Sequence, residues 1–256
     1  MRWISDAKRR QHRVAACIPL LAAAAVFAQQ PSGRPVVALP TPQGTSAVLS
    51  ATPSTTTAPA SYRVVLDPAH GGADPGAELQ AGLDEKTFTL TLAQAVATEL
   101  RAHSIPVTLT RTTDVALTGG ARAQAMNLLH VAACISLHAT ASGSGVHLYT
   151  SAQVQSATPD GQRDFVPWRT EQAGYVERSL RLESEVNSEL TRAHIPVLMG
   201  RATLMPMESA ACPALAVEVA PLNDGTTLSD AKYQQQVADA LTAALIDWSA
   251  DWKVQP

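Results

Sequence analysis

The sequence predicts a single α/β domain built on a twisted, largely parallel but mixed β-sheet flanked by helices. From residue 62 onward, short apolar and β-branched runs alternate with longer segments of helical period, a pattern typical of βαβ units. Apolar residues make up 46% of the chain, which is enough for an ordinary globular core. Residues 61–256 have a length that one hydrophobic core can support.

The expected elements follow from periodicity and from the residues that begin and end each segment. Residues 63–66 are an apolar run closed by Asp67-Pro68, which predicts a buried strand, and the glycine-rich residues 69–82 predict a loop. Asp84 is a suitable cap for a helix over 85–103, whose buried stripe is Phe88, Leu92, Val96 and Leu100. The same criteria predict strands at 107–110, 132–137, 145–150 and 214–219, and helices at 122–129, 171–193 and 234–248. Buried positions expected in the last two helices are Val176, Leu180, Leu190, Val237, Leu241 and Leu245.

The first 28 residues have the pattern of an export signal. A basic start precedes the short apolar stretch 14–28, and small residues stand where a signal peptidase reads, which predicts cleavage after Ala28. The alternative is an uncleaved membrane anchor, for which the stretch is short. Residues 29–60 are rich in Pro, Ser, Thr and Ala, and such a composition predicts a flexible linker. The expected organisation is therefore a signal peptide (1–28), a linker (29–60) and a catalytic domain (61–256), exported to the periplasm, cell envelope or medium.

Composition also excludes several classes of protein. The formal net charge is −3, without the clustered Lys and Arg of a nucleic-acid binder. No apolar run is long enough for an ordinary membrane span, so none is expected once the signal is removed. Three cysteines are too few for a disulfide scaffold of this length. Cys134 and Cys212 lie at or near predicted strands, and we expect buried free thiols there in preference to a disulfide.

Metal-capable and acidic residues follow, or stand near the end of, three predicted strands. His70 follows the first strand, His138 ends the strand 132–137, and Glu218 lies near the end of 214–219, while Glu85 opens the first helix. The carboxyl ends of strands gather at one edge of an open α/β sheet. Two imidazoles and one carboxylate make a catalytic zinc site with a position left for water, and a second carboxylate can serve as base. Spacing alone leaves open that His70 is a turn residue and His138 a core histidine.

Local motifs resolve this in favour of a metal site, because six of them occur in the order of one family. They are VVLDPAHGGADPGA at 64–77, TRTTD at 110–114, Arg122 five residues before Asn127, ISLHA at 135–139, GVHLY at 145–149 and PALAVEV at 213–219. Together they resemble the zinc-dependent N-acetylmuramoyl-L-alanine amidases of the third type, over residues 62–250. The resemblance implies a peptidoglycan hydrolase that cleaves the amide between N-acetylmuramic acid and L-alanine, in wall remodelling and daughter-cell separation.

The resemblance also implies the roles of individual residues. His70, Glu85 and His138 would hold one zinc ion per chain, and Glu218 would be the catalytic base. Asp67 is a candidate outer partner of His70, since ligating imidazoles usually donate their second N–H; its alternative role is a turn that ends the strand. Arg111 and Asp114 are expected to lock the fold. His103, His130, His147 and His194 are not expected to be ligands.

Some residues depart from the family pattern, and alternatives remain for the segment 141–170 and for the function. Ala69, Thr140 and Ala220-Pro221 replace residues usual in the family, and Ala69 predicts ordinary dihedral angles in its loop. The polar stretch 141–170 is a lid, a blocking segment or a plain loop, and a protein activator is a further expected partner. The competing functions are a zinc peptidase acting within the stem peptide, and a wall-binding or activator module that has lost catalysis.

Overall fold

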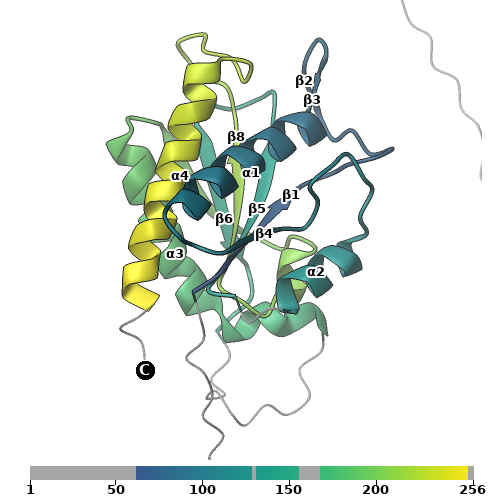
Figure 1. Ribbon diagram of the computed structural model, residues 1–256, viewed down its shortest axis with the longest axis vertical. Helices are drawn as coiled ribbons and strands as arrows, with labels where there is room; N and C mark the ends of the chain where they lie inside the picture. The colour runs from purple at the N-terminus through teal and green to yellow at the C-terminus, as the bar shows by residue number, and fades with distance from the viewer. Residues whose placement is uncertain (1–61, 129–130, 156–167, 253–256) are drawn as a thin grey trace, which may run out of the picture. The chain divides into compact units, whose positions relative to one another are not determined.

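The computed structural model describes residues 62–128, 131–155 and 168–252 (Figure 1). The predicted signal peptide (1–28) and linker (29–60), and His130, lie outside these residues. Within them, a central sheet carries helices on both faces, so the predicted α/β fold class is confirmed. No helix in the described ranges combines the length and apolar composition needed to cross a bilayer.

The central sheet has six strands in the order β4-β1-β5-β8-β6-β7. Every neighbouring pair is parallel except β6 and β8, which are antiparallel. The predicted mixed, largely parallel sheet is therefore correct. Its strands are β1 (Val64–Pro68), β4 (Val107–Leu109), β5 (Ala133–Ala139), β6 (Val146–Ser151), β7 (Val197–Ala202) and β8 (Ala214–Val219). A separate two-stranded ribbon, β2 (Glu78–Gln80) and β3 (Leu83–Asp84), lies between β1 and the first helix.

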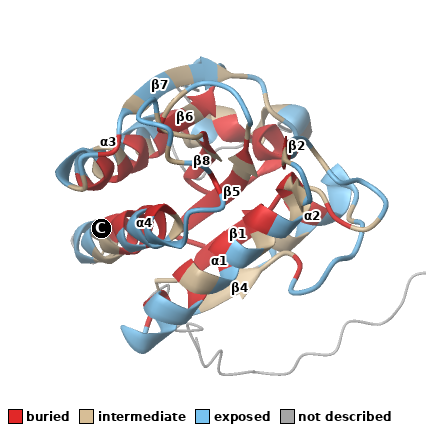
Figure 2. Cartoon of the chain, turned by 90° about the horizontal axis from the view of Figure 1, so that it is seen from above, coloured by how far each residue is buried: buried red, intermediate tan, exposed pale blue. Residues whose placement is uncertain are grey.

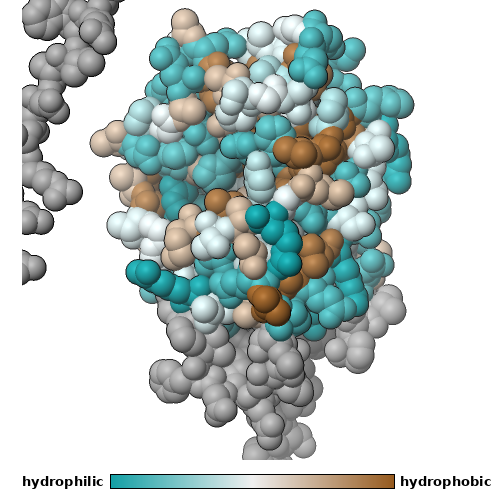
Figure 3. Space-filling model, turned by 180° about the vertical axis from the view of Figure 1, so that it is seen from behind, coloured by the Kyte–Doolittle hydropathy of each residue, from teal (hydrophilic) through white to brown (hydrophobic). Residues whose placement is uncertain are grey.

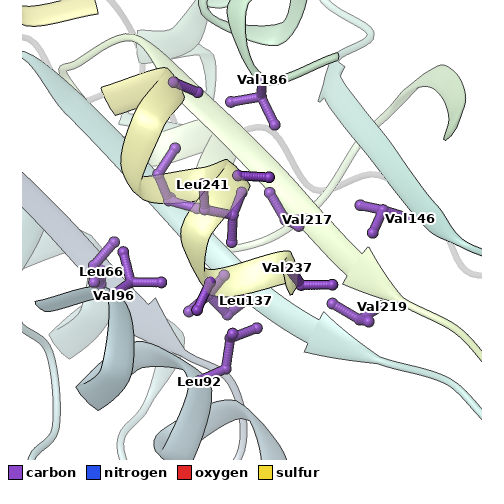
Figure 4. Packing of buried hydrophobic residues seen from close by; sticks show 14 of the residues in the cluster. Leu66, Leu92, Val96, Leu137, Val146, Val186, Val217, Val219, Val237 and Leu241 are labelled. Carbon is purple, nitrogen blue, oxygen red and sulfur yellow. The ribbon is translucent and has the colours of Figure 1, made fainter. Parts of the chain in front are cut away.

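Helices cover the two faces of the sheet unequally (Figure 2). The long helices α1 (Glu85–Ala102), α3 (Val176–Arg192) and α4 (Ala231–Trp252) pack on one face, and α2 (Gly119–Asn127) lies on the other. Two short 3-10 helices, η1 (Trp168–Gly174) and η2 (Met207–Ser209), precede α3 and β8. The larger core lies under the three long helices, where side chains such as Leu92, Leu137, Val217 and Leu241 interlock (Figure 4).

The other face of the sheet has a smaller core. Val65, Cys134 and Ala216 point to this side and pack with Met126 of α2 and Met207 of η2. Seen from behind, the described surface is mostly polar, and its apolar side chains form small separate groups (Figure 3).

The helical stripes predicted from i+4 spacing are largely confirmed. Phe88, Leu92, Val96 and Leu100 in α1, and Val237, Leu241 and Leu245 in α4, are all at most 3% exposed. Leu180 is a correction, because it is 39% exposed on α3. The predicted helix 171–193 is also too long: the chain forms η1 first, with a non-helical Thr170, and α3 starts at Val176. Asp84 is the N-cap of α1 by position, but its side chain makes no capping hydrogen bond.

Two regions of strand were not predicted. The expected loop 69–82 contains β2 and the turn into β3, and β7 was missed altogether. The strand β7 contains Gly200 and Arg201 and lies at the edge of the sheet, with Leu198 and Met199 more than half exposed. The sequence of β7 shows neither the alternation of apolar and polar residues nor the continuous apolar run that identifies a strand.

Candidate metal centre

The site lies where β1, β5 and β8 end side by side. These three strands are adjacent and parallel, so their carboxyl ends share one edge of the sheet, where α/β proteins place their ligands. His70 comes two residues after β1, His138 is near the end of β5, and Glu218 is its direct neighbour on β8. Glu85 is the first residue of α1. All four predicted residues are thus brought to one edge.

Three of these side chains converge on a common point. His70 Nε2 lies 3.1 Å from Glu85 Oε2, and His138 Nδ1 lies 3.0 Å from Glu85 Oε1. The two imidazole rings stand nearly perpendicular, at 89°, with centroids 5.7 Å apart. One donor atom from each residue lies within 4.8 Å of the other two, and in the described ranges this is the one group of this kind. Two imidazole nitrogens and a carboxylate oxygen are the donors of an open zinc site.

Glu85 is held as a carboxylate by its surroundings. It is 5% exposed, and burial raises the pKa of its carboxyl. Hydrogen bonds from His138 and from the backbone N–H groups of Ala77 and Ala139 outweigh that effect, so the pKa of Glu85 lies below its ordinary value. Glu85, which contacts both histidines, is therefore charged, and both of its carboxylate oxygens accept hydrogen bonds.

The loop that carries His70 has an unusual backbone. His70 itself has φ +60°, a left-handed conformation uncommon in non-glycine residues. The prediction of ordinary dihedrals is confirmed at Ala69 and wrong one residue later. Gly76 has φ +69°, and a Cβ there would lie 2.7 Å from both Glu85 Oε2 and His70 Cδ2. Glycine at this position lets the loop close against both side chains.

Charged side chains clamp this loop from outside. Arg111 donates to the carbonyl oxygens of Pro68, Ala69 and Lys86. Asp114 accepts from the backbone N–H of Gly72 at 2.6 Å and from Lys86 Nζ at 2.8 Å. The prediction that Arg111 and Asp114 lock the fold is confirmed. Each of the two side chains binds the loop that carries His70; they do not bind each other.

The prediction for Asp67 is wrong. Its buried carboxylate accepts from Arg122 Nη1 at 2.6 Å and from Thr110 Oγ1, and does not reach His70. His70 Nδ1 instead lies 2.8 Å from Asp74 Oδ2, and this bond lowers the pKa of Asp74. Asp67 points to the face of the sheet that α2 covers, whereas the left-handed turn directs His70 toward its own loop. Asp74 lies in the same sequence motif, four residues after His70. This position is the signal by which the sequence could have identified Asp74 as the partner of His70.

Glu218 lies beside the three converging residues and outside their group. Its Oε2 is 2.8 Å from Nδ1 of His147, which faces it across the antiparallel pair of β6 and β8. The sequence gives no signal for this contact of His147, because the neighbours of a strand cannot be assigned from one sequence. Of the stretch 141–170, residues 146–151 form β6 and 156–167 lie outside the described residues.

A disulfide joins Cys134 on β5 to Cys212, two residues before β8. The expectation of free thiols is therefore wrong. The two strands are neighbours in the sheet, with Cys134 in register with Ala214, and the Cα atoms of the two cysteines are 6.2 Å apart, within the normal range for a disulfide. This crosslink ties the strand that carries His138 to the segment 203–213, which leads into the strand that carries Glu218.

A cavity of about 220 Å³ opens beside the converging residues. His70 and His138 line one part of it, Arg122 and Leu117 another, and Met205 and Pro206 from the segment 203–213 close it on a third side. A small molecule or one residue of a polymer in this cavity would therefore lie against both imidazoles.

A sequence profile of the N-acetylmuramoyl-L-alanine amidases matches residues 64–247. The chain is 33% identical over 100 residues to the amidase AmiC of Neisseria meningitidis, covering 37% of this chain and 24% of AmiC. It is also similar to the solved amidase Ami1 of Mycobacterium smegmatis, with a TM-score of 0.60, 21% identity and coverage of 75% and 99% of the two chains. A third similarity is to the CwlD amidase of Clostridioides difficile, solved in complex with the GerS lipoprotein, with a TM-score of 0.55, 17% identity and coverage of 74% and 99%.

These similarities differ in what they establish. The solved structures support the fold, since their identities are low. The match spans only between 18% and 38% of the length of the curated relatives. The profile covers most of the folded residues and includes His70, Glu85, His138 and Glu218.

Proposed function

This chain belongs to the N-acetylmuramoyl-L-alanine amidase family, and from that premise we propose that it is a zinc-dependent hydrolase of bacterial peptidoglycan. The bond cleaved is the amide between the lactyl group of N-acetylmuramic acid and L-alanine of the stem peptide. The observation that carries the proposal is the convergence of His70, Glu85 and His138 within 4.8 Å, with Glu218 next to His138 on the neighbouring strand. The donor set matches an open catalytic zinc site.

In this proposal the three converging residues hold one zinc ion and Glu218 moves the proton. A bound zinc ion lowers the pKa of water and polarises the amide carbonyl. Glu218 accepts a proton from the attacking water and delivers it to the leaving amine. Its side chain is 32% exposed, so substrate and water can reach it. Asp74 orients His70, and the hydrogen bonds to Glu85 keep that carboxylate in place.

The test is digestion of purified peptidoglycan by the purified protein, with products identified by mass. We expect the products to include stem peptides with a free L-alanine amine. Exhaustive chelation should abolish the release of these peptides, and added zinc should restore it. Cleavage between two amino acids would instead identify a zinc peptidase. Binding to peptidoglycan without cleavage, in protein shown to contain zinc, would identify a non-catalytic wall-binding module.

The proposal includes export and organisation of the chain. Residues 1–28 act as a signal peptide, 29–60 as a linker and 61–256 as the catalytic domain, in the periplasm, cell envelope or medium. N-terminal sequencing of protein extracted from the envelope should begin at Gln29. A mature protein that retains Met1 would favour an uncleaved anchor.

The cellular role we propose is wall remodelling at daughter-cell separation, under the control of a protein activator. The CwlD amidase, solved in complex with a lipoprotein, supports the idea that amidase domains of this fold bind protein partners. Deletion of the gene should leave daughter cells joined in chains, and the Glu218→Gln variant should not restore separation. Separation restored by that variant would assign the role to binding alone.

A further inference from the structure

His147 is the histidine of this site that faces the proposed base and not the metal ligands. It lies directly opposite Glu218 in the antiparallel pair of β6 and β8, and its Nδ1 is 2.8 Å from Glu218 Oε2. The three donor atoms within 4.8 Å of one another come from His70, Glu85 and His138, so His147 is no part of that group. The contact of His147 with the site is therefore made through Glu218.

The imidazole of His147 is more deeply buried than the carboxylate of Glu218. The His147 side chain is 11% exposed and that of Glu218 is 32% exposed. On the far edge of the ring, a Cβ built on Gly143 would lie 2.6 Å from His147 Cε1 and 3.0 Å from Nε2. The backbone at Gly143, with φ +91°, thus packs against the ring and confines it between Gly143 and Glu218. A confined donor next to a more exposed carboxylate can set the orientation of that carboxylate.

Resting on the proposed function, we propose that His147 is the positioning residue of the catalytic base. In the tautomer that carries a proton on Nδ1, the imidazole of His147 donates this N–H to Glu218 Oε2, which occupies one carboxylate oxygen and fixes the plane of the group. Among the described residues no hydrogen bond is found to the other oxygen, Oε1, so Oε1 is the atom available to accept the proton of the attacking water. Preorganisation of this kind raises the rate of the chemical step without adding to substrate binding.

Three substitutions separate this role from simple packing. His147→Leu removes the hydrogen-bond donor and puts an apolar side chain of similar bulk in its place. His147→Asn places an amide N–H near the position of Nδ1, whereas His147→Gln places it near Nε2, which faces Gly143. The assay uses a soluble muramyl peptide, so that kcat and KM are both measured, and zinc content is determined for each variant.

We expect His147→Leu and His147→Gln to keep one zinc per chain and a KM within about twofold of the parent. Their kcat should fall about 10–100-fold, the effect typical of groups that orient an active-site ligand, and His147→Asn should recover most of that loss. In a Glu218→Gln background, His147→Leu should change the residual rate by less than about twofold, since coupled residues are not additive. The ¹⁵N shifts of His147 should report a protonated Nδ1 in the parent, with or without zinc, and change in Glu218→Gln.

The outcomes distinguish this inference from the proposed function. A parent protein that contains zinc and cleaves no muramyl amide contradicts the proposed function. An active parent contradicts the positioning role if His147→Leu turns over normally, or if the Asn variant is as slow as the Leu and Gln variants. An unprotonated Nδ1 in the ¹⁵N spectrum contradicts it independently of activity.

Discussion

The two sides of the site are built by different means. On the metal side, formed by β1, the start of α1 and β5, charged side chains hold a glycine-rich loop by bonding its backbone, as Arg111 and Arg122 do at Ala69 and His70. On the base side, formed by β6, β8 and the segment 203–213, a disulfide and buried polar side chains hold the chain.

The base side depends on contacts between distant parts of the sequence. Gln172 donates to the carbonyl oxygens of Ala210 and Cys212, and Asn127 accepts from the N–H of Ala211. Glu208, 1% exposed, accepts from Ser151 Oγ on β6. Local motifs therefore mark the site residues of both sides, including Glu218, whereas the contacts that hold the base side can be recognised only once the strands are placed.

Removal of the disulfide should break the base side with the largest effect on stability. The crosslink spans 78 residues, and a loop of that length corresponds to roughly 4 kcal/mol of the free energy of unfolding in the chain-entropy model. The Cys134→Ala, Cys212→Ala double variant should lose about that much in urea unfolding and still bind one zinc ion. Loss of zinc at unchanged stability would show that the metal side depends on the crosslink and that the two sides are not separately held.

Two buried carboxylates of the chain, Glu85 and Glu183, have pKa values shifted in opposite directions. Hydrogen bonds hold the pKa of Glu85 below its ordinary value, whereas burial of Glu183 on α3, only partly offset by Arg201, raises its pKa to about 7. Oε1 of Glu183 has no hydrogen-bond partner in the described part of the chain. Because the native state then holds a proton that the unfolded chain has lost, the free energy of unfolding should fall as the pH rises from about 4.5 to 7.

The Glu183→Gln variant removes this pH dependence. It should be more stable than the parent by up to about 3 kcal/mol at pH 8 and by nearly nothing at pH 4. Urea unfolding at the two pH values measures the difference. An equal change at both values would show that packing, and not ionisation, determines the cost at this position.

The smallest expected effect concerns the outer partner of His70. Asp74→Asn should weaken zinc binding about 10–100-fold, as loss of such partners typically does, in a competition titration with a chromophoric chelator. Asp67→Asn is the matched control: it should lower stability by about 3 kcal/mol or more, because it leaves the buried Arg122 without its ionic partner, and change zinc affinity less. The reverse pattern would restore Asp67 as the partner of His70.

Only part of the fold and of the candidate site could be predicted from the sequence. The stripes of α1 and α4, the edge that gathers the strands, and the set of His70, Glu85, His138 and Glu218 follow from periodicity and motifs. The partner of Cys134 and the contact of His147 with Glu218 depend on which strands are neighbours, and β6 runs against β8 in a sheet otherwise parallel. Asp67 was misassigned because its carboxylate accepts from Arg122 and Thr110, which are distant in the sequence.

Three residues are proposed to hold the metal and a fourth to move the proton, and the Glu218→Gln variant separates these two roles. The change keeps the size of the side chain and removes its ability to accept a proton. We predict that the purified variant contains one zinc ion per chain and hydrolyses peptidoglycan at least about 10²-fold more slowly than the parent, the usual loss without a general base. His138→Ala, in contrast, should lose both zinc and activity. A zinc-free Glu218→Gln protein would make Glu218 a ligand, and near-normal turnover would show that another group is the base.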